Sequence, residues 1–427
     1  MKKNFFIVFG GLFFALIIWV IGIYYFDILS STIFKDRIYG INYFNKYYEF
    51  LLGLIIYMFI QLILFFWNRK YAFIWFVKGF LITLIFMMFY EYKYGGDPAY
   101  YADEALKNIV NFRFGESGTY NIIIINHFFT FLVGKSYYSL KVLNSFIGFL
   151  GILFIYKTYE YILNKLNLKI NRYFIYILFF FPSILFWSSI LGKDPLNLFF
   201  IGIFVYAFVH FIDSPKLKYL MLIVLSIWLV SYIRSWWSLI MMISIFLYFL
   251  KINNLKNFMF FSILTPIVIY LMILFLQKNG IDSIQALFIK MSTTMQKLSY
   301  GGSSVGVAKI NNFFDYILWF VPNLFTALFR PMPWDIRNAF TALAAVENLV
   351  LLILVYKFII RNWKQIYSIK YIKFLILLIF SWALFYVIIS PTNLGMAARF
   401  KLQVLPIMLI IIGVSYEIYR QKNSNLS

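Results

Sequence analysis

The chain has 427 residues, of which 63% are hydrophobic, 23% aromatic and only 13% charged. Soluble domains are about 45–50% apolar and about 25% charged, so the composition excludes a soluble globular protein, and the lack of cysteine excludes a disulfide scaffold. The net charge of +22 lies mostly at the ends of apolar runs, where basic residues set orientation in a membrane. An all-α polytopic membrane protein is therefore predicted, because an exposed backbone has no hydrogen-bond partners in lipid.

Apolar runs of about twenty residues, long enough to cross a bilayer as a helix, recur along the chain. They predict about twelve membrane-spanning helices, at residues 5–26, 48–67, 72–91, 138–163, 173–190, 196–212, 219–234, 237–250, 256–277, 340–360, 372–390 and 401–419. The apolar stretch 314–329 is predicted to be re-entrant or interfacial, because a full crossing there would put the loop before it on the wrong side. Basic residues then concentrate on the cytoplasmic side, with both termini cytoplasmic, and residues 1–427 form a single transmembrane domain.

Two long polar loops, 92–137 and 278–313, are predicted to face outward, and the cytoplasmic loops are short. The first large loop is expected to contain an interfacial amphipathic helix at about Ala99–Asn111. The second contains Gly301–Gly306, which is suited to a mobile lid. Because the cytoplasmic loops lack a Gly-rich phosphate cradle, direct use of ATP or a nucleotide-sugar inside the cell is disfavoured.

The first polar motif, Tyr94–Ala105, contains two glycines and a proline that would hold Asp97 at the membrane edge. A partly desolvated carboxylate there is suited to act as a general base or to orient a sugar hydroxyl. The alternative interpretation is that Asp97 caps the following helix.

The second motif, Pro182–Pro195, is predicted to form the outer tip of a helix hairpin. Lys193 would bind a phosphate or a sugar there, with Asp194 holding the lysine in place. A solvated hairpin tip without function is the alternative.

Three outward arginines, Arg234, Arg330 and Arg399, end or begin long apolar helices far apart in the sequence. A planar guanidinium suits bidentate contact with a diphosphate, and nearby tryptophans suit the faces of sugars. Each arginine alone is equally compatible with a membrane-edge anchor. Three on one face of a chain with few charges favour a binding function.

Three further titratable residues give weaker signals. Glu347 is predicted in the outer half of a span, where a carboxylate is either functional or paired with one of the arginines. His127 is outward and titratable near neutral pH, although a lone histidine is usually structural. Lys78, within the third span, is expected to extend its ammonium to the cytoplasmic side. No zinc-type cluster and no cofactor motif is present, although a divalent metal is left open.

Taken together, these motifs resemble the GT-C class of polytopic membrane glycosyltransferases, including the Wzy-type O-antigen and capsule repeat-unit polymerases. The resemblance rests on four places: Gly96-Asp97 followed by Tyr100, Tyr101 and Ala105; Pro182, Trp187 and Lys193-Asp194; Arg330 to Trp334 with Glu347; and Ala398-Arg399 with Pro406. These motifs are short, while the general layout covers most of the chain.

The resemblance implies a glycosyltransferase that acts at the extracytoplasmic face of a bacterial cytoplasmic membrane on sugars linked to a polyprenyl phosphate or diphosphate. Asp97 would be the base or would position the acceptor, and basic residues would bind the phosphate. The expected substrate-binding residues are Lys193, Asp194, Arg234, Arg330, Arg399, Glu347, Tyr100, His127 and, for stacking on sugars, Trp187, Trp236, Trp237 and Trp334. The chain lacks a doubled acidic motif at Asp97, which puts metal dependence in doubt, and a large soluble outer domain, which argues against an oligosaccharyltransferase that recognises a protein sequon.

Several functions stay open at this point. A polymerase of lipid-linked repeat units is favoured over a transferase that adds one sugar from a monophosphate carrier. A flippase for lipid-linked oligosaccharides is disfavoured because few polar groups are predicted along a path through the bilayer. A membrane acyltransferase or a structural partner is disfavoured because no His-centred motif is found. The expected partners are polyprenyl-linked glycans, lipid and other polysaccharide-assembly proteins, and no nucleic acid.

Overall fold

The computed structural model describes residues 47–94, 96–107, 117–250, 280–299 and 310–424, and the single residues 115 and 270. Every regular element in these residues is a helix. The chain divides into two compact units. The first unit comprises residues 1–114, 119–146 and 189–192, and the second comprises residues 115–118, 147–188 and 193–427.

The protein is a multi-pass helical membrane protein. Six described helices are long and apolar enough to span a bilayer: Tyr48–Trp67, Arg69–Glu91, Tyr137–Lys165, Lys193–Asp213, Ala339–Ile360 and Lys370–Ile388. A seventh span results if Leu394–Lys401 and Leu405–Asn423, which meet at a bend of 58°, form one crossing. Four shorter apolar helices are Gly118–Val133, Leu217–Ile233, Ser235–Phe249 and Phe313–Phe329.

These six or seven spans account for part of the predicted twelve. The predicted span 5–26 and, apart from residue 270, the predicted span 256–277 lie outside the described residues. The predicted spans 219–234 and 237–250 are short helices, and 173–190 is divided at Phe181, where Pro182 starts a new helix. The last predicted span, 401–419, starts later than expected and is preceded by a separate helix.

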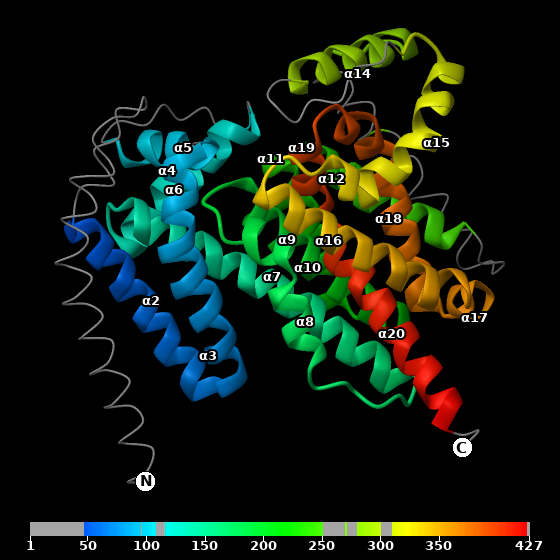
Figure 1. Cartoon of the computed structure of the whole chain (residues 1–427), viewed down its shortest axis with the longest axis horizontal. Helices are drawn as coiled ribbons and strands as arrows, with labels where there is room; N and C mark the ends of the chain where they lie inside the picture. The colour runs from blue at the N-terminus through cyan, green and yellow to red at the C-terminus, as the bar shows by residue number, and fades with distance from the viewer. Residues whose placement is uncertain are drawn as a thin grey trace. The chain divides into compact units, whose positions relative to one another are not determined.

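The first unit contains two antiparallel apolar spans, Tyr48–Trp67 and Arg69–Glu91 (Figure 1). Its elements are α2 (Tyr47–Trp67), α3 (Arg69–Trp75), η1 (Phe76–Phe86), α4 (Met87–Tyr94), α5 (Asp97–Leu106), α6 (Gly118–Val133) and the start of α7 (Tyr137–Lys165). Asn68 ends α2 and caps α3, since its side chain accepts a hydrogen bond from the Lys70 amide at 2.9 Å. The segment 92–137 thus contains α6 and also α5, a helix that overlaps the one expected at about Ala99–Asn111, whose interfacial placement stays a prediction.

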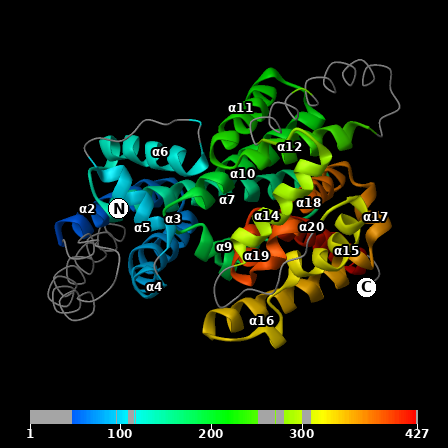
Figure 2. The same cartoon turned by 90° about the horizontal axis from the view of Figure 1, so that it is seen from above.

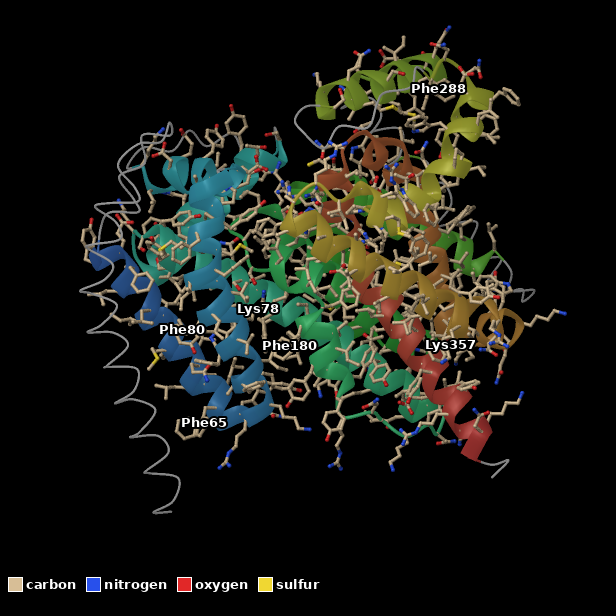
Figure 3. The ribbon with its side chains drawn as sticks, in the orientation of Figure 1. Phe65, Lys78, Phe80, Phe180, Phe288 and Lys357 are labelled. Atoms are coloured by element: carbon tan, nitrogen blue, oxygen red, sulfur yellow. The ribbon has the colours of Figure 1, made fainter. Side chains whose placement is uncertain are left out.

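The expectation for Lys78 was wrong. The Lys78 side chain is fully buried, and its ammonium donates to the Ser189 hydroxyl at 2.7 Å instead of reaching the cytoplasmic side. Lys78 lies in η1, a π-helix on the same span as Phe80 (Figure 3). The wider π turn brings the Thr83 hydroxyl 2.8 Å from the Lys78 carbonyl. The turn therefore groups polar atoms on the buried side of this span.

The second unit contains the remainder of α7 and most of the other helices. In chain order they are α8 (Phe174–Phe180), α9 (Pro182–Trp187), α10 (Lys193–Asp213), α11 (Leu217–Ile233), α12 (Ser235–Phe249), α14 (Ile284–Leu298), α15 (Phe313–Phe329), η2 (Pro333–Asp335), α16 (Ala339–Leu354), η3 (Val355–Ile360), α17 (Trp363–Ser368), α18 (Lys370–Ile389), η4 (Ser390–Thr392), α19 (Leu394–Lys401) and α20 (Leu405–Ser424). Helices α10, α11 and α12 lie next to one another, and α12 packs on α18 (Figure 2).

Glycines allow the backbones of α7 and α10 to come into direct contact. A Cβ atom added at Gly151 would lie 2.7 Å from the Cα of Phe199, and one added at Gly202 would collide with the backbone of Gly151. Small residues at a helix contact permit this close approach in membrane proteins. The contact fixes the position of α10 against the second-unit part of α7.

Acidic residues mark both ends of α10. Asp194 lies in its first turn, and Asp213 is its last residue. Asp213 accepts hydrogen bonds from the Tyr161 hydroxyl at 2.8 Å, the Tyr371 hydroxyl at 2.5 Å and the Lys370 ammonium. The end of α10 is thereby joined to α7 and α18.

The second long loop contains an amphipathic helix, α14. Phe288 and Met295 of α14 form a buried cluster with Ile310 and with Ile388 of α18. The proposed lid, Gly301–Gly306, lies outside the described residues. The apolar stretch 314–329 is observed as α15, and its re-entrant or interfacial placement stays a prediction.

Candidate functional site

Three charged residues predicted from distant parts of the sequence meet in the second unit. Asp194 Oδ1 accepts from Arg234 Nη2 at 2.6 Å, and Asp194 Oδ2 accepts from Arg399 Nε at 2.6 Å. The Asp194 side chain is fully buried, and each arginine side chain is 14% exposed. We call Asp194, Arg234 and Arg399 the arginine cluster.

Local sequence explains how each member reaches the cluster. Gly192 has a φ of +150°, so the chain turns sharply before α10 and places Asp194 in the first helical turn, where the helix dipole favours a negative charge. Arg234 has extended backbone angles and separates α11 from α12. Asn393 caps α19 through the Gly395 amide at 2.9 Å, and Arg399 lies in the last turn of that helix.

Aromatic rings flank both guanidinium groups. The Arg399 guanidinium lies 5.6 Å from the centre of the Trp187 ring, and that of Arg234 lies 5.4 Å from the Phe400 ring. Such contacts stabilise a cation and do not occupy its N–H donors. Two arginines share one carboxylate, so the arginine cluster has a net charge of +1. The Nε of Arg234 is buried without a hydrogen-bond partner among the described residues.

The expected partner of Asp194 was the adjacent Lys193, whereas the structure gives this carboxylate two arginines. Lys193 is the first residue of α10 and is partly buried. Sequence adjacency favoured the lysine, but successive residues of a helix do not face each other.

The predicted tryptophans have different environments. Trp187 contacts Arg399 as described, and Trp236 packs on Phe385 with ring centres 5.3 Å apart. Trp237 is fully buried, and its indole N–H donates to the Gln403 side chain at 2.7 Å. Trp334 is 71% exposed. Among these four rings, Trp187 is therefore the one observed in contact with the arginine cluster.

Arg330 binds within its own turn and is not part of the arginine cluster. Its Nε and Nη2 donate to the two carboxylate oxygens of Asp335, at 2.9 and 2.5 Å. This hydrogen bonding lowers the pKa of Asp335 below its usual range. The turn is tied to α16 because Asn348 Nδ2 donates to the Pro331 carbonyl at 2.8 Å.

Glu347 is buried beside a lysine that the sequence interpretation missed. Its Oε2 accepts from the Ser183 amide at 2.7 Å, and the buried Lys401 ammonium interacts with it electrostatically. Lys401 also donates to Asn348 Oδ1. The observed hydrogen-bond partner of Glu347 is thus the Ser183 amide and not one of the predicted arginines. The sequence could have indicated Lys401 as a candidate, because this lysine follows Arg399 by two positions just before an apolar helix.

Asp97, Tyr100 and His127 belong to the first unit. Asp97 is the first residue of α5 and is exposed, and Gly96, with a φ of +125°, takes the capping position that was the alternative for Asp97. Tyr100 is also exposed. His127 is buried, and its Nδ1 is 2.8 Å from the Ala105 carbonyl. His127 therefore joins α6 to the end of α5.

Among the described residues, no group of three or more His, Asp and Glu side chains is arranged to hold a metal ion. The chain matches no model of a known protein family, no curated protein and no solved structure.

Proposed function

We propose that this protein is a membrane glycosyltransferase of the GT-C type, which acts at the extracytoplasmic face of a bacterial cytoplasmic membrane. Its donors are sugars on a polyprenyl phosphate or diphosphate, and its favoured activity is polymerisation of polysaccharide repeat units. The observation that carries this proposal is the arginine cluster. Arg234 and Arg399 come from distant helices, share one buried carboxylate and keep a surplus positive charge.

The depth of the arginine cluster supports a lipid-linked substrate. Asp194 and Asp213 are 19 positions apart on α10, which corresponds to about 28 Å at 1.5 Å per residue. The hydrocarbon core of a bilayer is about 30 Å thick. With Asp213 near one boundary, the arginine cluster would lie near the other, at the level of lipid headgroup phosphates.

Glycosyl transfer from such a donor requires stabilisation of the departing phosphate. Arg234 and Arg399 would bind that phosphate, because guanidinium groups match its oxygens in geometry and charge. Trp187 would stack on the adjacent sugar, while Lys193 and Arg330 would bind further polar groups. Asp97 keeps its predicted role as base or acceptor-positioner.

The finer topology belongs to the same proposal. We propose about twelve crossings with both termini cytoplasmic, of which 5–26 and, apart from residue 270, 256–277 lie outside the described residues. Leu217–Ile233 and Ser235–Phe249 would each cross, as would α8 and α9 together.

A specific observation also favours a second function, translocation of a lipid-linked glycan. The first unit has ionisable side chains within its spans. Lys78 donates a hydrogen bond to the Ser189 hydroxyl, and Lys141 donates one to the Glu91 carboxylate at 2.6 Å. Ionisable groups at such depth mark transport pathways as well as active sites. This finding weakens the argument that had disfavoured a flippase.

The decisive experiment is reconstitution of the purified protein in liposomes with lipid-linked glycan extracted from source cells that lack this gene. A ladder of extended glycans supports the polymerase, and addition of one sugar supports the single-sugar transferase. Movement of the unaltered glycan across the bilayer supports the flippase. An unaltered glycan that does not move would contradict all three functions.

A further inference from the structure

The two carboxylate oxygens of Glu347 differ, because one accepts a hydrogen bond and the other accepts none from the described residues. Oε2 accepts the Ser183 amide hydrogen bond, whereas Oε1 is buried without a hydrogen-bond partner among the described residues. The side chain as a whole is 5% exposed. A buried acceptor left unpaired is destabilising, so an open oxygen of this kind in a fold points to a ligand or a catalytic role.

Two short helices connect Glu347 to the arginine cluster. Helix α9 carries Ser183, which binds Glu347, and one helical turn later Trp187, which contacts Arg399. Helix α19 carries Arg399 and, two residues later, Lys401, whose ammonium donates to the side chain of Asn348, the residue after Glu347. Both connections are a few residues long, so the carboxylate and the guanidinium groups belong to one neighbourhood of the second unit.

The other described carboxylates of the second unit are otherwise engaged or distant. Both oxygens of Asp194 and of Asp335 are bound by arginine, and Asp213 lies at the opposite end of α10. Glu160 pairs with Lys157, Asp315 accepts from the Asn311 amide, and Asp282 is exposed. Glu417 also has an open oxygen, but it lies 12 residues beyond the start of α20, which corresponds to about 18 Å along that helix. Glu347 alone among them combines an open buried oxygen with short connections to the arginine cluster.

We infer that Glu347 is the general base of the transfer reaction, an assignment that rests on the proposed glycosyltransferase function. The acceptor hydroxyl would donate its proton to Oε1 as its oxygen forms a bond to the anomeric carbon of the donor sugar. The bond between that carbon and the phosphate oxygen breaks, and the electron pair leaves on the phosphate, which Arg234 and Arg399 stabilise. The Ser183 amide holds the carboxylate in place throughout.

This assignment places the base in the second unit. Asp97 is exposed at the start of α5 in the first unit, and its predicted role stands as a separate prediction. The carboxylate that removes the proton comes from the same unit as the groups that bind the leaving phosphate. A base and a phosphate site in one compact unit keep a fixed geometry during the reaction.

The test uses the reconstituted full-length protein with two readouts: extension of the extracted lipid-linked glycan, and binding of undecaprenyl diphosphate as a probe without sugar. Glu347→Gln keeps the size of the side chain and an oxygen for the Ser183 amide. We expect this variant to lower the turnover number about 10²–10⁴-fold and to leave the affinity for the probe within about twofold. Arg399→Ala should lose affinity for the probe, and Glu160→Gln is the matched control at a partly exposed carboxylate of the same unit.

Two further variants separate a base from a charge that merely balances Lys401. Glu347→Ala should regain activity in the presence of formate, a small carboxylate that fills the vacated space, whereas Asp97→Ala should not. Glu347→Gln combined with Lys401→Gln should stay inactive. Normal turnover in Glu347→Gln, or recovery in the double variant, would overturn the assignment while leaving the proposed function intact. If the wild-type protein transferred no sugar, the proposed function itself would fail.

Discussion

Asp194 and Asp213 occupy opposite ends of α10, and each binds cationic side chains from other helices. Asp194 binds Arg234 and Arg399, whereas Asp213 binds Lys370. The two carboxylates are separated by about one bilayer core, as estimated from the helical rise. One helix thus carries a cluster of basic side chains at each of its two ends.

The first prediction concerns the stability that Asp194 provides. Asp194→Asn would leave two guanidinium groups without their shared carboxylate, and loss of one partner of a buried ion pair costs about 3–5 kcal/mol. A lower midpoint of thermal unfolding in detergent would show this cost. Glu160→Gln, which breaks a more exposed pair with Lys157, should change the free energy of unfolding by less than about 1 kcal/mol. Equal midpoints for both variants would contradict the prediction.

The second prediction concerns the pH dependence of the Arg330 turn. Because Arg330 lowers the pKa of Asp335, the ionised carboxylate stabilises the fold at pH values above its unfolded-state pKa of about 3.9. This stabilisation is lost as the pH falls through the lower pKa of the folded state. The difference in unfolding midpoint between the wild type and Asp335→Asn should therefore be largest near neutral pH and should shrink in acid. A constant difference across that range would refute this account.

The third prediction concerns Asp97. Asp97→Asn should abolish glycan assembly in cells while the amount of protein in the membrane stays normal. Asp103→Asn, six residues further along α5 and within 3.8 Å of Lys107, is the matched control and should assemble glycan normally. Retained assembly in Asp97→Asn would remove this residue from the site.

The fourth prediction concerns the contact of α7 with α10. Gly202→Ala places a methyl group against the backbone of Gly151, and overpacking of this kind costs about 1–3 kcal/mol. Denaturation of the purified protein should reveal the loss. Val224→Leu adds a methylene at an exposed position of α11 and should change stability by at most about 0.5 kcal/mol. A Gly202→Ala protein as stable as the Val224→Leu protein would show that the helices separate easily.

The fifth prediction concerns the buried lysines of the first unit. Lys78 and Lys141 are fully buried, whereas the Lys107 side chain is 49% exposed. A membrane-permeant amine reagent should modify Lys107 readily and spare the other two until the protein is denatured, as measured by peptide mass spectrometry. Rapid modification of Lys78 in the folded protein would restore the interpretation that its ammonium reaches the membrane surface.

The general class and part of the site were predictable from local sequence. Apolar run length identified the six described helices that are long and apolar enough to cross a bilayer, because the length requirement is a property of each segment alone. Arg234 and Arg399 were found because a guanidinium at the end of an apolar helix needs a partner. Their convergence on Asp194 was not predictable, since the three residues are up to 205 positions apart.

Other features depend on contacts that local patterns do not encode. Lys78 is near enough to one end of its span to suggest an extended side chain, but its partner, Ser189, is 111 positions away. The position of Lys401 was not predicted, because its hydrogen-bond partner, Asn348, is 53 positions away. Helix α6 was taken for loop because at 16 residues it is shorter than a full crossing.

The backbone contact between Gly151 and Gly202 also limits how the second unit can move. With no side chain between them, α7 and α10 cannot rotate past each other about their long axes without steric collision. Asp194 must therefore travel together with the second-unit part of α7. Under the proposed function, any opening that admits a bulky lipid tail would have to come from helices other than these two.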